Sequence, residues 1–230
     1  MTIHITRLLA TSAIATLIAV NTFAADNDGF TPIFDGKTSD GWHSIKGPDF
    51  PKTGWEIKDG LLTVLAGGKG GDIITTKKYT NFDLCFEFKL TTGANSGIKY
   101  FIDPEKTKAV GYEFQVLDDD KHPDAKLGIN GNRTVGSLYD IVPACKDKKV
   151  KPIGEWNQGR IVVKGDHIEH WLNGEKVVEI DRASADFKSH FEASKFKKDT
   201  GFTSRTGGHI LLQDHNNLVY FRNLRIKELP

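Results

Sequence analysis

Residues 82–90 read Phe-Asp-Leu-Cys-Phe-Glu-Phe-Lys-Leu and form the clearest strand signal in the 230-residue chain. Five apolar residues alternate here with Asp83, Cys85, Glu87 and Lys89. Successive side chains of a β-strand point to opposite faces, so this pattern predicts a strand with one face in a core. We therefore expect a domain in which each sheet buries one face against another layer.

The same signal recurs along the chain. Further strands are predicted at residues 55–57, 61–64, 98–102, 112–117, 160–164, 168–172, 176–180, 209–213 and 218–227. Asp59-Gly60 and Asn173-Gly174 are dipeptides that favour tight hairpin turns. Only residues 183–197 favour a helix, because Phe187 and Phe191 are four positions apart. The expected fold is an all-β antiparallel β-sandwich with one short helix.

Residues 1–24 have the composition of a secretory signal peptide. Arg7 supplies a positive start, an apolar run extends from Leu8 to Val20, and small residues precede a cleavage site near Ala24. This run is too short to span a bilayer comfortably, and no similar run follows it. The sequence thus predicts an exported protein, periplasmic or secreted, with residues 25–230 as a single β-sandwich domain. We expect no membrane span in the mature chain.

The mature chain carries no net charge. Arg7 is the one Lys or Arg residue in the leader, so 30 basic and 30 acidic residues remain after it is removed. A neutral chain is not typical of proteins held to nucleic acids or anionic membranes by bulk electrostatics, and we expect no nucleic-acid partner. Cys85 and Cys145 are the only cysteines. Whether they pair is open, and neither has the Cys-X-X-Cys spacing of a redox or zinc site.

Residues 112–118, Tyr-Glu-Phe-Gln-Val-Leu-Asp, hold the first candidate functional side chains. Glu113 and Gln115 share the face opposite the apolar residues, and Asp118 begins a run of three aspartates; an ordinary solvated face is the plain alternative. Retaining β-glucanases of jelly-roll fold carry Glu-X-Asp-X-X-Glu on such a strand. This chain has an amide in the second place and a shorter acid in the third. Retaining hydrolysis needs two matched carboxyl groups about 5 Å apart, so the sequence does not support it.

Three histidines are candidates for proton transfer, since histidine titrates near neutral pH. His209 and Gln213 share one face of a predicted strand, and His215 follows where that strand ends. His170 lies on another predicted strand, between Ile168 and Leu172. Alternation does not decide which face of that strand is buried, so His170 is either a site residue or a core histidine.

Aromatic side chains on an open sheet face can stack on the C–H face of a pyranose ring. Trp171 and Tyr139 are the candidates for such contacts, whereas Trp42, Trp55 and Trp156 are expected in the core. Together with the polar face of residues 112–118, these rings favour a surface that works on carbohydrate.

Six short motifs follow one another along the chain: Trp55-Glu56-Ile57 with Asp59-Gly60, Asn95-Ser96-Gly97-Ile98, the stretch 112–118, Gly154-Glu155-Trp156-Asn157, residues 170–174, and Leu212-Gln213-Asp214-His215 closing on Phe221-Arg222-Asn223. In this order they resemble the 3-keto-disaccharide hydrolase family, formerly a domain of unknown function, over about residues 29 to 229. The resemblance implies a concanavalin A-like, jelly-roll sandwich.

The resemblance also implies a substrate that a separate sugar 3-dehydrogenase has already oxidised at C3. Members of such a family are 3-keto-glycoside 1,2-lyases that also hydrate the 2-hydroxy-3-keto-glucal product, and the net reaction is hydrolysis. A ketone at C3 acidifies the C2 proton, so one base, one acid and a group that stabilises an enolate suffice. No second matched glutamate is needed.

Roles for the candidate residues follow as hypotheses. His170 or His215 acts as the base, and Glu113 or Asp118 as the acid. The remaining side chains bind sugar hydroxyls, sugar rings or the enolate: Lys99, Gln115, Tyr139, Trp171, His209 and Gln213. A divalent metal ion held by histidine and carboxylate groups could stabilise the enolate instead, and the spacing does not decide this.

Two other functional classes stay open. A non-catalytic carbohydrate-binding module would use the same aromatic and amide side chains but has no need of paired histidines and acids. A laminin-G-like adhesion domain would bind calcium through Asp118, Asp119 and Asp120. The sequence leaves open the anomeric preference, the aglycone, the metal requirement and the oligomeric state.

Overall fold

The computed structural model of the chain describes residues 29–106 and 109–230. The strands in these residues are β1 (Thr31–Pro32), β2 (Trp42–Ser44), β3 (Trp55–Lys58), β4 (Leu61–Val64), β5 (Ile73–Tyr79), β6 (Phe82–Leu90), β7 (Asn95–Ile102), β8 (Tyr112–Leu117), β9 (Trp156–Lys164), β10 (His167–Leu172), β11 (Glu175–Asp181), β12 (Gly208–Leu212) and β13 (Val219–Glu228). The helices are η1 (Pro123–Lys126, a 3-10 helix) and α1 (Ala185–Ala193). The predicted signal peptide lies outside the described residues.

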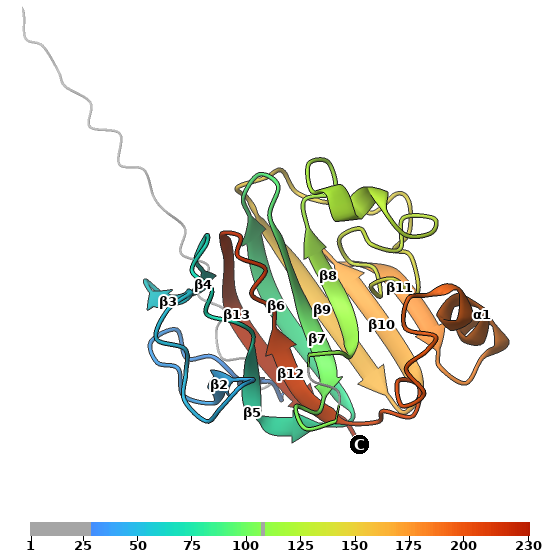
Figure 1. Cartoon of the computed structure of the whole chain (residues 1–230), viewed down its shortest axis with the longest axis horizontal. Coiled ribbons are helices and arrows are strands. Elements are labelled where there is room, and N and C mark those ends of the chain that lie inside the picture. The colour runs from blue at the N-terminus through green and yellow to red at the C-terminus, as the bar shows by residue number, and fades with distance from the viewer. Residues whose placement is uncertain (1–28, 107–108) are drawn as a thin grey trace, which may run out of the picture.

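The strands form two antiparallel sheets that pack face to face, as the sequence predicts. One sheet has the order β11-β10-β9-β6-β13-β4-β3 with β1 beside β13, and the other has the order β2-β5-β12-β7-β8. Figure 1 shows β12, β7 and β8 in front of β6, β9 and β10, with α1 at one end of the sandwich. Among the described residues, no helix is long and apolar enough to cross a bilayer.

Strand β6 provides the centre of the core. Its five alternating apolar side chains are at most 2% exposed, and their outer neighbours face away from the second sheet. The ring of Phe86 meets Phe114 of β8 edge to face, with centroids 5.2 Å apart. Gly159 of β9 pairs with Phe86, and a Cβ atom there would lie 2.2 Å from the ring. Burying one such aromatic side chain stabilises the fold by roughly 2 kcal/mol.

The helix and one tryptophan differ from the predictions. Helix α1 is shorter than the predicted 183–197, because Ser184 caps its start by accepting a hydrogen bond from the backbone N–H of Phe187, and Ser194 is already extended. Trp42 and Trp55 are buried, as predicted. Trp156 is not in the core: it lies on the outer face of the larger sheet, with the Arg222 guanidinium 4.0 Å from its ring. Cys85 and Cys145 do not form a disulfide with each other.

His170 is a core residue, which corrects its sequence-based assignment as a base. Its side chain is fully buried between the sheets. The ring donates from Nδ1 to the carbonyl oxygen of Gly136 at 3.0 Å and accepts at Nε2 from the Tyr100 hydroxyl at 3.1 Å. Burial lowers the pKa of His170 to about 4. The ring therefore stays neutral and has no contact with solvent.

This buried histidine makes the stability of the fold sensitive to acid. His170 takes up a proton near pH 6.5 in the unfolded chain but only near pH 4 in the folded one. The stability it provides is therefore complete above pH 6.5 and is lost as the pH falls towards 4. We predict that the free energy of unfolding falls between pH 7.5 and pH 4 by about 3 kcal/mol less in His170→Gln than it does in the wild type. Urea unfolding at both pH values measures this difference, and equal losses in the two proteins would contradict it.

Candidate functional site

A pocket of about 470 Å³ opens on the outer face of the five-stranded sheet, over β7 and β8. Its floor consists of side chains on or directly after strands of this sheet, and Lys99, Glu113 and Gln115 have neighbours on both sides that lie in the core. These floor residues are Asn95, Lys99, Glu113, Gln115 and Gln213. Polar wall residues come from the connecting segments, and they are His122, Asp124, Tyr139, Lys195 and His215. The sandwich thus supplies a rigid polar floor, while loops supply the walls.

Glu113 lies at the centre of the floor. It is only 6% exposed, and its Oε2 atom is 3.8 Å from the Lys99 ammonium nitrogen. Within the described residues its carboxylate accepts no hydrogen bond. Gly97 on the adjacent strand leaves room for it, because a Cβ atom at Gly97 would lie 2.1 Å from Glu113 Oε1. The carboxylate therefore lies across a bare stretch of backbone.

Burial is the main influence on the protonation of Glu113. Removal from water raises its pKa, and the ammonium groups of Lys99 and Lys195 offset only part of that effect. Asp72 and Asp124 raise the pKa further. A carboxyl group with a raised pKa is a stronger base when it is ionised, and a larger share of it is protonated near neutral pH and able to donate a proton. The pocket can therefore carry out proton transfer at Glu113.

Two histidines meet at the rim of the pocket. The rings of His122 and His215 are 5.8 Å apart and nearly perpendicular. His122 accepts a hydrogen bond at Nδ1 from the backbone N–H of Asp124, so its proton is on Nε2. Burial and the neighbouring His215 lower the pKa of His122. The rim thus offers a second proton-transfer group apart from the floor.

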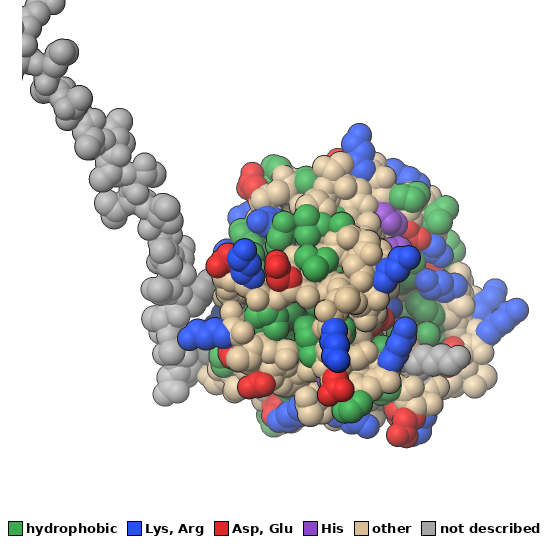
Figure 2. Space-filling model, turned by 60° about the vertical axis from the view of Figure 1, so that its left-hand side comes forward, with side chains coloured by type: hydrophobic (Ala, Val, Ile, Leu, Met, Phe, Trp, Pro, Cys, Tyr) green, Lys and Arg blue, Asp and Glu red, His purple; other side chains and the backbone are tan. Residues whose placement is uncertain are grey.

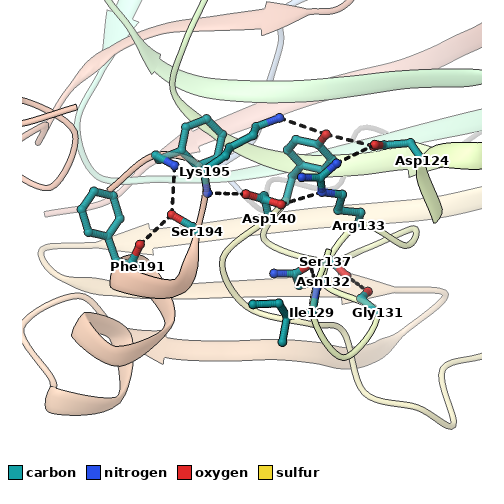
Figure 3. A network of polar contacts seen from close by, with 12 residues as sticks. Asp124, Ile129, Gly131, Asn132, Arg133, Ser137, Asp140, Phe191, Ser194 and Lys195 are labelled. Atoms are coloured by element: carbon teal, nitrogen blue, oxygen red, sulfur yellow. Dashed lines mark hydrogen bonds and ion pairs between the residues drawn. The ribbon is translucent and has the colours of Figure 1, made fainter. Parts of the chain in front are cut away.

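One wall is held by a closed ring of hydrogen bonds and ion pairs, which Figure 3 shows from close by. The Lys195 ammonium donates to the Tyr139 hydroxyl at 3.0 Å, and that hydroxyl donates to Asp124 at 2.9 Å. Arg133 joins Asp124 at 2.9 Å to Asp140 at 2.5 Å. The ring closes where Asp140 accepts from the backbone N–H of Lys195 at 2.7 Å.

Six of the ten predicted site residues come together at this pocket. They are Lys99, Glu113, Gln115, Tyr139, Gln213 and His215. Tyr139 does not offer a free ring, because the ammonium of Lys195 lies 4.1 Å from its centroid and the Arg133 guanidinium 5.6 Å from it. The hydroxyl group of Tyr139, and not the face of its ring, is therefore the part that is available to the pocket.

The structure places Asp118 outside the pocket. Its carboxylate accepts hydrogen bonds from the backbone N–H groups of Gly93 at 2.7 Å, Asp120 at 3.0 Å and Lys121 at 3.2 Å. These contacts fix the turn after β8. Asp119 instead pairs with Lys148 at 2.9 Å. The aspartate run is therefore used in separate structural contacts, which weakens its interpretation as a calcium site.

Trp171 and His209 are also away from the pocket. Trp171 lies on the outer face of the larger sheet, where Nε1 donates to Glu169 at 2.8 Å. His209 lies near the start of β12, the central strand of the smaller sheet, and its Nδ1 donates to the carbonyl oxygen of Thr75 at 2.6 Å. Both residues correct the sequence-based hypothesis that they bind substrate. Their strands point them to surfaces that the pocket does not include.

Four polar lining residues were not predicted from the sequence: Asn95, His122, Asp124 and Lys195. Asn95 belongs to one of the six sequence motifs. In the sheet it lies opposite Leu117 of β8. His122 and Asp124 follow the aspartate run, where a loop after a polar strand face is a reasonable place to look. Lys195 follows α1, and the sequence around it shows no pattern that indicates a pocket residue.

A group of metal-ligand type occurs elsewhere on the molecule. In residues 29–106 and 109–230 the one set of three such ligand atoms within 4.8 Å comes from His167, Glu169 and Glu179. Lys176 already neutralises this set, at 3.2 Å from Glu169 and 2.6 Å from Glu179. The described pocket residues do not include such a set of three atoms, and the divalent ion considered from the sequence stays a prediction.

Charges of both signs are interspersed on the face of the molecule in Figure 2. This mixture agrees with the balanced composition of 31 basic and 30 acidic residues. It gives no continuous basic area on that face of the kind that nucleic-acid binding uses.

Comparison with known proteins gives one family for this chain. The 3-keto-alpha-glucoside-1,2-lyase-like domain matches residues 29–227. The 3-keto-disaccharide hydrolase of Bacteroides thetaiotaomicron is 37% identical over 233 residues, which cover 89% of this chain and 80% of that protein. A crystal structure of a candidate glycosyl hydrolase from Parabacteroides distasonis has a TM-score of 0.78 and 34% identity, over 88% of this chain and 94% of the other.

A more distant structure shares the fold alone. A carbohydrate binding module from Bacillus subtilis has a TM-score of 0.50 at 14% identity, and the match covers 82% of this chain and 96% of the module. The predicted jelly-roll, concanavalin A-like class is therefore confirmed, together with the predicted family resemblance.

Proposed function

The chain belongs to the 3-keto-alpha-glucoside-1,2-lyase-like domain family, and we propose that it hydrolyses 3-keto-disaccharides and related 3-keto-glycosides by elimination and rehydration. Family membership and the curated relative support hydrolysis of 3-keto-disaccharides. The observation that carries the mechanism is the Glu113 carboxylate, which is buried at the pocket floor with a raised pKa and no hydrogen-bond donor among the described residues.

Glu113 is the base that removes the C2 proton. The C2–H bonding pair forms a C2=C3 double bond, and the carbonyl pair moves onto O3, which becomes an oxyanion. The C3 ketone makes this proton acidic enough for a carboxylate, and desolvation of Glu113 makes the carboxylate a stronger base. The ammonium of Lys99 beside it favours the ionised form and offsets part of the rise in the pKa of Glu113.

Collapse of the enolate expels the aglycone. The O3 pair re-forms the C3 carbonyl, the C2=C3 pair forms C1=C2, and the C1–O bond breaks with both its electrons. The departing oxygen takes a proton from His215 at the rim, where His122 lies against it. Water then adds its oxygen to C1 and a proton to C2 of the 2-hydroxy-3-keto-glucal. The sum of both steps is hydrolysis of the glycosidic bond.

These roles reverse the sequence-based assignment, which made a histidine the base and Glu113 or Asp118 the acid. His170 has no access to substrate, and the Asp118 carboxylate is engaged in a turn. Glu113 lies on the floor, where we place the sugar ring, whereas His215 lies at the rim, where we place the departing aglycone. The order of the groups along the pocket therefore favours Glu113 on the floor as the base and His215 at the rim as the acid.

Amide groups on the floor bind sugar hydroxyls. Gln115 accepts at Oε1 from the backbone N–H of Val116 at 3.1 Å, which leaves its NH₂ group as a donor. Asn95 is 4% exposed, and its Oδ1 has no hydrogen-bond partner in the described residues. A buried acceptor without a partner is costly, and a substrate hydroxyl would relieve that cost. Gln213 supplies a further amide at the edge of the floor.

The proposed substrate needs prior oxidation at C3, so a separate sugar 3-dehydrogenase is the proposed source of it. A non-catalytic carbohydrate-binding module is the second candidate. Such a module would gain nothing from a desolvated carboxylate at its floor, because a buried, unsatisfied charge weakens the fold without adding to hydroxyl recognition. The pocket chemistry favours the enzyme.

Replacing the proposed base tests the mechanism directly. We predict that Glu113→Gln lowers kcat for a 3-keto-glucoside by about 10² to 10⁴-fold, because the amide cannot accept the C2 proton. Glu56→Gln, an exposed glutamate on β3, is the matched control and keeps wild-type turnover. The wild type should leave the unoxidised parent glucoside intact. Release of aglycone from both substrates is followed by mass spectrometry, and near-wild-type turnover by Glu113→Gln would refute the assignment.

The bare backbone under Glu113 provides an independent test. A methyl group at Gly97 meets only the mobile end of the Glu113 side chain at 2.1 Å, so Gly97→Ala should fold normally but displace the carboxylate. We predict a loss of about 10²-fold in kcat/KM, the size expected when a catalytic group moves by an ångström. Gly47→Ala meets nothing within 4 Å and is the control. Thermal unfolding checks the fold of both variants, and equal activities would show that Glu113 placement is unimportant.

A further inference from the structure

Lys195 is the second lysine that lines the pocket; it lies in the wall, and its surroundings differ from those of Lys99 on the floor. Lys99 lies 3.8 Å from Glu113 and donates to the carbonyl oxygen of Ala109 at 3.3 Å. In the described residues no carboxylate oxygen lies within 4 Å of the Lys195 ammonium, whose one hydrogen bond goes to the Tyr139 hydroxyl. Lys195 is therefore a cation that faces the pocket without a counter-ion in direct contact.

The closed ring of contacts fixes the position of this ammonium. Asp140 holds the backbone of Lys195, and the Tyr139 hydroxyl holds the end of its side chain. Phe196 packs on the buried ring of Phe202, with centroids 4.8 Å apart, and so anchors the next residue of the segment. A preorganised cation of this kind can stabilise developing negative charge without reorganisation at the moment of reaction.

The groups around Lys195 shift its pKa in both directions. Lys195 as a whole residue is exposed, yet partial removal of its ammonium from water is the largest influence on its pKa and lowers it. Asp140, Glu113 and Asp124 raise this pKa, and Arg133 lowers it. The Tyr139 hydroxyl stays protonated, because burial and its bond to Asp124 raise its pKa. Lys195 and Glu113 each influence the pKa of the other, so both charges act on the same small volume.

We propose that Lys195 is the catalytic residue that binds O3 of the 3-keto sugar and stabilises the enolate oxyanion, with the Tyr139 hydroxyl fixing its direction. This inference rests on the proposed function. C2 and C3 are adjacent atoms, so the base and the oxyanion-binding cation must face the same part of the ring. Glu113 and Lys195 line the same pocket, whereas Lys99 is engaged with the base itself. The same ammonium would favour a ketone over an alcohol at C3 because only the ketone develops charge there.

Exchange of the C2 proton isolates enolate formation from cleavage. The probe is the C3 ketone of 1,5-anhydroglucitol, which has no leaving group at C1, incubated in D₂O and followed by proton NMR. We expect wild-type protein to exchange the C2 proton, and Lys195→Met to exchange it about 10²-fold more slowly, the effect of removing one oxyanion donor. Lys197→Met, an exposed lysine two positions further on, should exchange at the wild-type rate.

The outcomes separate this inference from the proposed function. Equal exchange by the wild type and a folded Lys195→Met would overturn the role of Lys195 and leave Glu113 as the base. No exchange above that of Glu113→Gln in any protein would overturn both proposals. Thermal unfolding establishes that Lys195→Met is folded.

A pH profile covers the case in which Lys195→Met does not fold. The wild-type exchange rate should fall in the alkaline range as the Lys195 ammonium loses its proton. Lys195→Arg keeps its charge over that range, so its alkaline limb should move to higher pH even if its rate is lower. If Lys195 had a purely structural role, the exchange rate would fall over the same alkaline range in Lys195→Arg as in the wild type, and that result would contradict the proposal.

Discussion

The Glu113 carboxylate lies across Gly97 with one ammonium group 3.8 Å away and no hydrogen-bond donor from the described residues. A buried carboxylate in this state costs folding free energy, and the surrounding structure must hold it there. Strand β8 does so by placing Phe114 and Val116 in the core on its other face. The same alternation that forms the sandwich therefore directs Glu113 and Gln115 into the pocket.

The pocket has a floor built on strands and walls built on loops. This division matches the proposed roles of Glu113 as the base and of the wall residues Lys195 and His215 as the oxyanion-binding group and the acid. The floor is part of a hydrogen-bonded sheet, so Glu113 has little freedom to move. The walls come from segments near residues 122–140, 195 and 215, and the first two are joined by the ring that runs through Tyr139, Asp124, Arg133 and Asp140. A rigid base with cation and histidine groups on separate loops is an arrangement in which substrate contacts can vary while the proton-transfer centre stays fixed.

Much of this architecture could be predicted from the sequence, because period-two alternation reports directly on sheets with one buried face. Residues 112–117 were assigned the correct bounds and the correct faces, so Glu113 and Gln115 were found. Strand β5 was missed because its buried and exposed residues come in blocks and do not alternate. His170 was ambiguous for a different reason: alternation gives two faces, and only the packing of the sheets tells which one is inside. Lys195 could not be found, since a segment distant in sequence from β8 brings it to the pocket.

The central claim is that the C2–H bond of the substrate breaks before the glycosidic bond does. Incubation of a 3-keto-glucoside with the protein in D₂O measures this, because rehydration of the glucal delivers a solvent deuteron to C2. The account predicts one deuterium at C2 of the released 3-keto-glucose, above the level that the same sugar acquires with Glu113→Gln. Released 3-keto-glucose without deuterium at C2 would contradict it and indicate direct hydrolysis at C1.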